Sequence, residues 1–260
     1  MARSNAELEQ FAFVASHDLQ EPLRKIQAFG DRLKTKCEEA RLEAGRDYLE
    51  RMQSAVARMR RLIEDLLTFS RVISRTEPFA PVNLATVVKE VLGDLEVRIE
   101  KSGAKIEVTE IPTVEGDAVQ MRQLLQNLIC NALKFQPPGS KPVVSIRGRL
   151  IPRSGMGDQT AILSRASGET AAAVEDQVCE LIVQDNGIGF DEKYLDKIFA
   201  VFQRLHGRQE YEGTGIGLAV CRRIMERHGG KITAQSKPGE GATFVVQLPV
   251  RQNQPPPKPT

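Results

Sequence analysis

An apolar seam that repeats every seven residues constrains the first part of this chain more than any other feature. Its members alternate spacings of four and three along residues 48–69: Tyr48, Met52, Ala55, Met59, Leu62, Leu66 and Phe69. This spacing is typical of a helix that packs along a coiled-coil-like seam. A second apolar series predicts an earlier helix, which Pro22 should bend: Leu8, Phe11, Ala15, Leu19, Leu23, Ile26 and Leu33.

The two predicted helices lie within residues 5–72 and are joined by the polar segment 38–46, where Gly45 favours a turn. A single hairpin leaves part of both seams exposed, whereas two paired hairpins form a four-helix bundle that buries them. We therefore predict a homodimer through residues 5–72. The alternative, a monomeric hairpin docked on the rest of the chain, fits a seam of this length less well.

A second domain is predicted beyond a segment that contains Pro78 and Pro81. Asp117 and Gln120 have the spacing of a helix capping box. Predicted helices at 84–101, 117–135 and 216–228 are mixed with predicted strands at 106–111, 142–150, 178–185, 231–236 and 242–248. This mixture predicts an α/β sandwich. The fold class is therefore multidomain, α and α+β.

The predicted organisation is a helical hairpin over 1–73, a linker over 74–83, an α/β domain over 84–250 and a disordered tail over 251–260. The run 151–177 is rich in Gly, Ser, Ala and Thr, so we predict a long loop that extends a hairpin. The proline-rich tail need not bind an SH3-type domain.

Charge, cysteine and hydropathy patterns exclude several classes of protein. The 36 basic residues are nearly balanced by 34 acidic residues, which argues against a nucleic-acid-binding protein. The cysteines show no CxxC spacing, so reduced cytosolic thiols are expected rather than a zinc site or a disulfide framework: Cys37, Cys130, Cys179 and Cys221. We find no run of about 18 apolar residues and no signal peptide.

Two glycine-rich segments are candidates for ligand contacts. Asp185–Phe190 reads Asp-Asn-Gly-Ile-Gly-Phe after an apolar run. It would place a carboxylate beside backbone that a ligand can approach, although an ordinary turn explains it equally well. Gly213–Leu218 leads directly into a predicted helix, whose free N–H groups and dipole favour an anion. A phosphate site is favoured there, but the segment does not fit a Rossmann fingerprint.

A polar stripe is predicted on the helix 117–135. Asn127, Asn131 and Lys134 are spaced by four and three residues, so they share one face. An amide oxygen is a suitable magnesium ligand, and an ammonium group is a suitable partner for phosphate. Each residue alone would be an ordinary surface residue. Combined with the two glycine-rich segments, the stripe favours a magnesium–nucleotide site.

His17 is the candidate nucleophile, since it lies off the apolar seam of the first helix. Neutral imidazole is nucleophilic near pH 7, and the neighbouring Asp18 can orient it and accept its proton. His206 is predicted in a loop. His228 is predicted at a helix end, where a cation is simply favourable. From the residues alone, an exposed helical histidine is more often inert than catalytic.

Taken together, these segments resemble the HisKA type of sensor histidine kinase over residues 5–250. Ser16–Arg24 resembles the phosphoacceptor box in the version of phytochrome-like kinases. The other family boxes follow in order: Asn127–Lys134 (N box), Asp185–Gly189 (first glycine box), Ile198–Phe202 (phenylalanine box), Gly213–Leu218 (second glycine box) and Gly239–Phe244 (the last strand turn).

The resemblance implies a Bergerat (GHKL ATPase) fold for the second domain, with ATP and Mg2+ as ligands. It implies that Asp185 binds the adenine amino group with support from Thr243, and that Asn131, beside Asn127, holds magnesium. Lys134 would contact the phosphates. Residues 190–213 would form a lid. The remaining nucleotide-binding residues implied are Gly187, Gly189, Phe199, Phe202, Arg204, Gly213, Thr214, Gly215, Gly217 and Leu218.

The resemblance also implies a reaction and its partners. His17 would be phosphorylated by ATP, with Asp18 accepting the imidazole proton, and the group would pass to an aspartate of a response-regulator receiver domain. The sensor domain would lie outside this chain. We expect a cytoplasmic location, either free or as the cytoplasmic part of a larger sensor.

Glu21 departs from many relatives, which have Thr or Asn four residues after the histidine to position a hydrolytic water. Strong phosphatase activity is therefore in doubt. Two alternatives remain open: a GHKL-type ATPase without phosphoacceptor activity, and an inactive dimerisation and docking module. The sequence does not decide whether a subunit phosphorylates itself or its partner.

Overall fold

The computed structural model describes residues 21–22, 24–26, 28–33, 35, 42–74, 78–153, 177–207 and 210–252. The chain divides into two compact units, Met1–Thr68 and Phe69–Thr260. The division falls within helix α2 (Leu42–Ser74), a few residues before the predicted end of the helical hairpin.

The first unit contains the predicted hairpin. The described residues between 21 and 35 are helical, as is α2. The Phe29 and Tyr48 rings stack with centroids 6.1 Å apart, and a Cβ built on Gly30 would lie 3.8 Å from Met52 Cε. Residues late in the first helix thus face residues early in α2, as an antiparallel hairpin requires.

The predicted turn at 38–46 is wrong at its second end, because α2 already begins at Leu42 and includes Gly45. A glycine inside a helix costs only about 1 kcal/mol relative to alanine. In proteins, most helix stability comes from packing of an apolar face rather than from propensity. The seam that follows therefore outweighs one unfavourable residue.

Helix α2 has two apolar stripes. Along the predicted seam Ala55 and Leu62 are buried, whereas Tyr48, Met52, Met59 and Leu66 are half-buried. A second stripe, spaced by seven residues, is exposed: Leu49 (43% exposed), Val56 (46%) and Ile63 (41%).

The second unit is built on a mixed sheet of strands in the order β2-β4-β5-β7-β6. The strands are β2 (Lys105–Val108), β4 (Val143–Pro152), β5 (Gln177–Asp185), β7 (Ala242–Pro249) and β6 (Lys231–Ser236). Strands β2 and β4 are parallel and the other neighbours are antiparallel.

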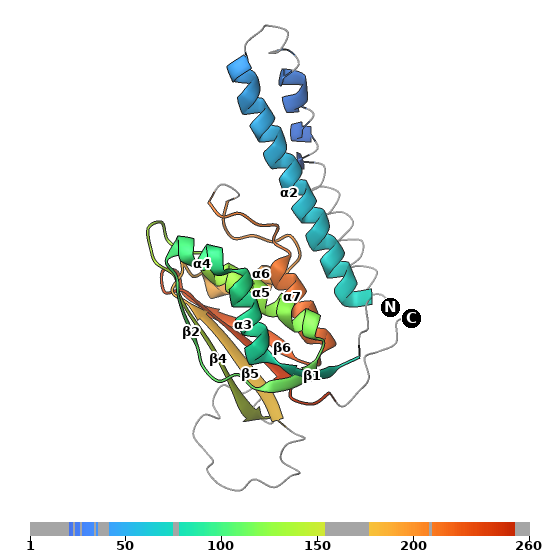
Figure 1. The fold of residues 1–260 in the computed structure, drawn as a ribbon, viewed down its shortest axis with the longest axis vertical. Helices are drawn as coiled ribbons and strands as arrows, with labels where there is room; N and C mark the ends of the chain where they lie inside the picture. Colours follow the sequence, from blue (N-terminus) through green and yellow to red (C-terminus); the bar gives the residue numbers. More distant parts are fainter. Residues whose placement is uncertain are drawn as a thin grey trace. The chain divides into compact units, whose positions relative to one another are not determined.

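Helices cover one face of this sheet (Figure 1). They are α3 (Leu84–Asp94), α4 (Glu96–Ser102), α5 (Ala118–Lys134) and α7 (Gly217–Arg227). Between helices and sheet lies the core, in which Leu128 of α5, Ile146 of β4 and Val246 of β7 are fully buried. The predicted α/β sandwich is confirmed. The helix predicted over 84–101 is two helices that meet at Leu95.

The end of the predicted linker is a strand, contrary to our prediction. Strand β1 (Ala80–Asn83) pairs antiparallel with β3 (Thr113–Gly116). Pro81 is tolerated because this small sheet has only two strands, so each strand is an edge strand. Neither strand was predicted, since each has only four residues and shows little alternation of apolar and polar side chains.

Two other predicted boundaries move. Strands β4 and β5 extend into the predicted loop 151–177, and residues 154–176 lie outside the described part. At the predicted tail, Gln252 is held rather than disordered, because its N–H donates to Glu115 Oε2 at 2.9 Å. Within the described residues, no helix has the length and apolar character needed to cross a membrane.

Candidate functional site

Asp185 ends β5 on the side of the sheet that faces the helices. Its Oδ1 accepts hydrogen bonds from the N–H groups of Gly187 (2.8 Å) and Ala242 (3.2 Å). Burial raises the pKa of Asp185 to about 6, against the lowering effect of these two bonds. Oδ2 makes no hydrogen bond with any described residue. The carboxylate is therefore fixed in orientation while one oxygen remains available to a donor.

The glycines around Asp185 allow neighbouring backbone segments to approach one another closely. A Cβ built on Gly187 would lie 2.2 Å from the carbonyl oxygen of Phe135. Gly241 has a φ of 81°, and a Cβ there would lie 2.0 Å from the carbonyl oxygen of Asp185. Gly189 similarly packs against the Lys237 carbonyl. These close approaches join the end of β5 to the end of α5 and to the turn before β7.

The predicted polar stripe of α5 contains residues in two different situations. Asn127 Nδ2 donates to the carbonyl of Gly217 (3.1 Å), and its Oδ1 accepts from Gln123 Nε2 (3.2 Å). Asn127 thereby ties α5 to the first turn of α7. Asn131 is half-buried, and its side chain makes no hydrogen bond within the described part of the chain.

Lys134 lies at the end of the same stripe, in a site unfavourable to its own charge. Burial, with the nearby guanidinium groups of Arg204 and Arg98, lowers its pKa to about 8, against the raising effect of Cys130 and Glu212. Its Nζ lies 3.0 Å from the position of a Cβ built on Gly213. Three cations therefore lie close together, and an anion bound beside Lys134 would stabilise its charged form.

Residues 190–213 are held in place by two phenylalanines near the middle of the segment. The segment contains the 3₁₀ turn η3 (Glu192–Tyr194) and helix α6 (Leu195–Ile198). Phe199 is buried, with the Arg222 guanidinium 5.2 Å from its ring centroid. Phe202 adopts a φ of 63°, and its N–H donates to Gly215 O at 3.0 Å. The phenylalanine segment is thus bonded directly to the second glycine-rich segment.

Arg204 binds carbonyl groups of its own segment in this structure. Its guanidinium donates to Gly213 O (2.8 Å), to Gly207 O (3.3 Å) and to Tyr211 O. Tyr211 in turn donates its hydroxyl hydrogen to Gln136 O (2.9 Å), and its ring lies 5.2 Å from that of Phe135. We missed these two aromatic residues, since only folding brings them together.

The strand register corrects the prediction for Thr243. Ala242, Phe244, Val246 and Leu248 alternate along β7 and are all buried in the core. Thr243 lies between the first two, so its side chain points to the opposite face of the sheet. Asp185 instead receives the backbone N–H of Ala242. The alternation was visible in the sequence and already indicated Ala242.

The remaining predicted residues have different outcomes. Thr214 and Leu218 are half-buried on either side of Gly215 and Gly217. His17 and Asp18 lie outside the described residues. Glu21 is described, and its Oε1 accepts from Lys25 Nζ at 2.7 Å. Within the described residues, no group of three or more His, Cys, Asp or Glu side chains is arranged to hold a metal ion.

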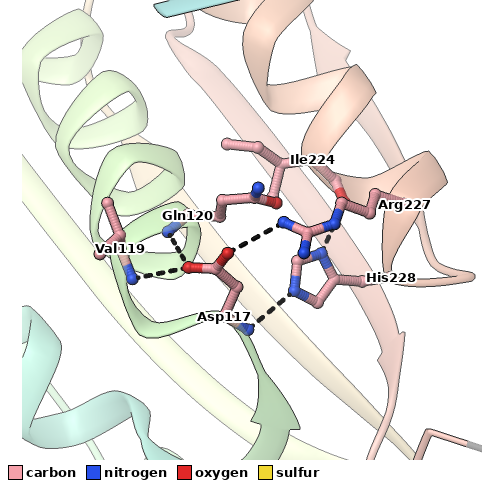
Figure 2. Close-up of polar contacts among 6 residues, drawn as sticks. All are labelled: Asp117, Val119, Gln120, Ile224, Arg227 and His228. Atoms are coloured by element: carbon pink, nitrogen blue, oxygen red, sulfur yellow. Dashed lines mark hydrogen bonds and ion pairs between the residues drawn. The ribbon is translucent and has the colours of Figure 1, made fainter. Parts of the chain in front are cut away.

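His228 is a buried neutral residue rather than the helix-end cation that we predicted. Burial lowers its pKa, and it is fully buried. Nδ1 contacts Ile224 O at 2.8 Å, and Nε2 accepts from the N–H of Asp117 at 3.1 Å (Figure 2). The predicted capping box is half confirmed: Asp117 Oδ1 accepts from the N–H of Gln120, but His228 takes the place expected for the Gln120 side chain.

Two protein families match the chain. The profile "Histidine kinase-, DNA gyrase B-, and HSP90-like ATPase" covers residues 116–252, and the profile "His Kinase A (phospho-acceptor) domain" covers residues 7–75. Phytochrome-like protein Cph1 of Synechocystis is 39% identical over 96% of this chain and 30% of its own length. Cyanobacterial phytochrome A of Nostoc is 38% identical over 96% and 29%. The chain thus spans less than a third of these relatives.

Solved structures share the fold at low sequence identity. Histidine kinase ThkA, in a complex with the response regulator protein TrrA, matches with a TM-score of 0.65 and 21% identity, over 96% of this chain and 64% of that one. The Acinetobacter baumannii histidine kinase AdeS matches with a TM-score of 0.62 and 20% identity, over 92% and 98%. At these identities the likeness shows the fold.

Proposed function

Because this chain belongs to the sensor histidine kinase family and contains its phosphoacceptor and ATPase domains, we propose that it transfers the γ-phosphoryl group of ATP to His17. The observation that carries the proposal lies in the ATPase domain. Asp185, a half-buried carboxylate with no cation bound to it among the described residues, is joined through Gly187 to the end of α5, where Lys134 lies near other cations.

The proposed nucleotide contacts follow from these charges. The free oxygen of Asp185 would accept a hydrogen bond from the adenine amino group. Lys134 would contact phosphate oxygens, and the added negative charge would raise its pKa again. Arg204 would have to give up bonds to Gly213 O and Tyr211 O before it reached a phosphate. We therefore assign the main phosphate contact to Lys134.

The residues present also fit a magnesium ion. Mg2+ prefers oxygen ligands and is commonly held by one or two protein groups together with substrate phosphates. The amide oxygen of Asn131 would be that protein group, whereas Asn127 is engaged with Gly217 and Gln123. When bound, the ion would supply neutralisation of charge on the phosphates.

The proposed transfer is an in-line displacement. An imidazole nitrogen of His17 forms a bond to the γ-phosphorus, the bond from that phosphorus to the β,γ-bridging oxygen breaks, and ADP leaves. Asp18 accepts the proton released by the imidazole. The reaction depends on holding the ring and the phosphorus in line, which is a matter of positioning.

Because ATP is the substrate, we place the protein in the cytoplasm.

We propose a homodimer through residues 5–72. The stripe of Leu49, Val56 and Ile63 is exposed, whereas the neighbouring seam is buried or half-buried. A helix with two apolar stripes is suited to pack in a bundle of more than two helices. A second copy of the hairpin would supply the missing helices.

The second proposed partner is a receiver domain, whose aspartate would take the phosphoryl group from His17. ThkA, a histidine kinase with the fold of this chain, forms a complex with the response regulator protein TrrA, which supports this type of partner. The Glu21 carboxylate accepts a hydrogen bond from Lys25 on the helix surface. This contact supports the view that Glu21 does not position a hydrolytic water. We therefore propose mainly kinase activity. A cognate phosphorylated regulator that loses its label faster when the chain and ADP are added would contradict this.

Labelling with γ-labelled ATP tests the proposal. We expect acid-labile, alkali-stable label on the chain, absent in His17→Gln and retained in the control His206→Gln. Continuous release of free phosphate without labelled protein would instead indicate a plain GHKL-type ATPase. Neither label nor phosphate release would indicate a docking module.

A further inference from the structure

A buried polar cluster joins the C-terminal end of α7 to Asp117 at the start of α5 (Figure 2). Arg227 Nη1 lies 2.9 Å from Asp117 Oδ2, with side chains only 9% and 5% exposed. His228 is held from both ring nitrogens, by Asp117 N–H and by Ile224 O. Burial and these contacts restrict the three side chains, so together they form an ordered surface.

Phe79 packs on this ordered surface. Its ring centroid lies 4.6 Å from that of the His228 imidazole, with 31° between the ring planes. The Arg227 guanidinium carbon lies 5.4 Å from the Phe79 centroid, within the range of a cation–π contact. Because both partners are already immobilised by Asp117, contact with them fixes the Phe79 ring without ordering further side chains.

Few other contacts attach this part of the chain to the domain. Strand β1, which begins directly after Phe79, has four residues and buries only Val82. A two-stranded sheet of this length is marginal by itself. Pro78 precedes Phe79 and restricts the backbone there. Phe79 is therefore the large side chain through which the segment 78–83 packs against the end of α7.

We propose that Phe79 is a positioning residue for phosphoryl transfer: its contact with Arg227 and His228 fixes the segment that leads from α2 into β1 against the end of α7, and so the geometry in which ATP is presented to His17. This inference rests on the proposed function. A loose attachment would leave the ATP-binding unit intact but spread its orientations, and loss of alignment of about 1 Å lowers a transfer rate by about 100-fold.

The nucleotide residues are far enough away to be unaffected. Helix α7 has 11 residues, so its two ends are separated by about 16 Å. Arg227 and His228 lie at one end, whereas Gly217, which contacts Asn127, lies at the other. A change at Phe79 should therefore separate binding of ATP from its use.

The test compares variants of the full chain by two measurements: Kd for a non-hydrolysable ATP analogue, and the initial rate of His17 labelling at saturating ATP. For Phe79→Ala we expect a labelling rate about tenfold or more below wild type, with Kd within about twofold. Phe79→Tyr keeps the ring and should restore the rate. Val119→Ala is the matched control, because Val119 is 74% exposed and joins the same cluster only through its backbone.

Phe79→Leu replaces Phe79→Ala in the test if the alanine variant is unstable. Its labelling rate should fall about threefold. The inference is overturned when these variants label His17 at the wild-type rate. It is also overturned when rate, Kd and thermal stability worsen in parallel, since that pattern indicates a purely structural residue. A wild-type chain that binds the analogue but never labels His17 would instead overturn the proposed function.

Discussion

Two carboxylates in the ATP-binding unit, the buried Asp117 and the half-buried Asp185, accept hydrogen bonds in the same way and have opposite consequences. In each, Oδ1 accepts two backbone N–H groups. In Asp117, Oδ2 is paired with the Arg227 guanidinium. In Asp185, Oδ2 has no partner among the described residues, and burial raises the pKa of the carboxyl group to about 6.

This difference separates a stabilising residue from a binding residue. A buried charge with a partner forms an ion pair within the fold, and removing either member leaves the other charge uncompensated. A buried charge without a partner makes the empty fold less stable, and a ligand that supplies a donor recovers that free energy. The local hydrogen-bonding pattern is the same, so only the third partner distinguishes the two roles.

The largest effect should come from Asp117→Ala. It leaves the buried Arg227 uncompensated, so we expect the free energy of unfolding to fall by about 3–5 kcal/mol, measured by urea denaturation of the full chain. ATP affinity of the folded fraction should be unchanged. The control is Glu90→Ala, which removes an exposed partner of Arg122 and should change the free energy by less than about 1 kcal/mol. Equal losses of unfolding free energy in the two variants would show that the buried pair stabilises the fold no more than the exposed pair does.

Asp185→Asn should show the reverse behaviour. Loss of a charged acceptor should weaken ATP binding by about 10- to 100-fold. Stability should be kept or increased, since the variant removes a partly desolvated charge that has no cation bound to it among the described residues. Calorimetric titration with an ATP analogue, together with thermal unfolding, checks both expectations. A variant that unfolds at a clearly lower temperature would place Asp185 with Asp117 as a stabilising residue.

The pH dependence sharpens the same contrast. Between about pH 4 and 6 the folded chain keeps a proton on Asp185 that the unfolded chain has lost, so this group's contribution to stability falls as pH rises. Ligand binding needs the ionised form, so ATP affinity should fall below about pH 6. From pH 7.5 to 5.5 we expect wild type to lose about fourfold more affinity than Asp185→Asn. Comparing the two chains cancels titration of the ATP phosphates. Identical pH profiles would contradict the assignment.

The smallest effect should come from Thr243→Val. This residue lies beside Ala242 in sequence but on the opposite face of the sheet from Asp185. We expect ATP affinity within about twofold of wild type and a stability change below about 0.5 kcal/mol. An affinity loss comparable to that of Asp185→Asn would show that Thr243 supports the adenine contact after all.

Patterns within single elements were predictable, and contacts between elements were not. The seam of α2, the α5 helix with its Asp117 cap and the β5 strand ending at Asp185 each follow from local periodicity or capping. The pairing of Asp117 with Arg227 joins residues 110 positions apart. Nothing in either local sequence specifies that pair. Strand β1 was missed partly for the same reason, since its residues pair with residues 30 to 36 positions away.

The sequence by itself determined the order of elements, the family and the residue types available for nucleotide chemistry, because periodicity, capping and spaced motifs act over a few residues. Only the tertiary structure decided which carboxylate receives a cation and which face of β7 meets Asp185. It likewise decided that His228 is neutral and that Phe79 packs against it. The physical reason is that burial and partner charges belong to a place in space, and residues distant in sequence create that place together.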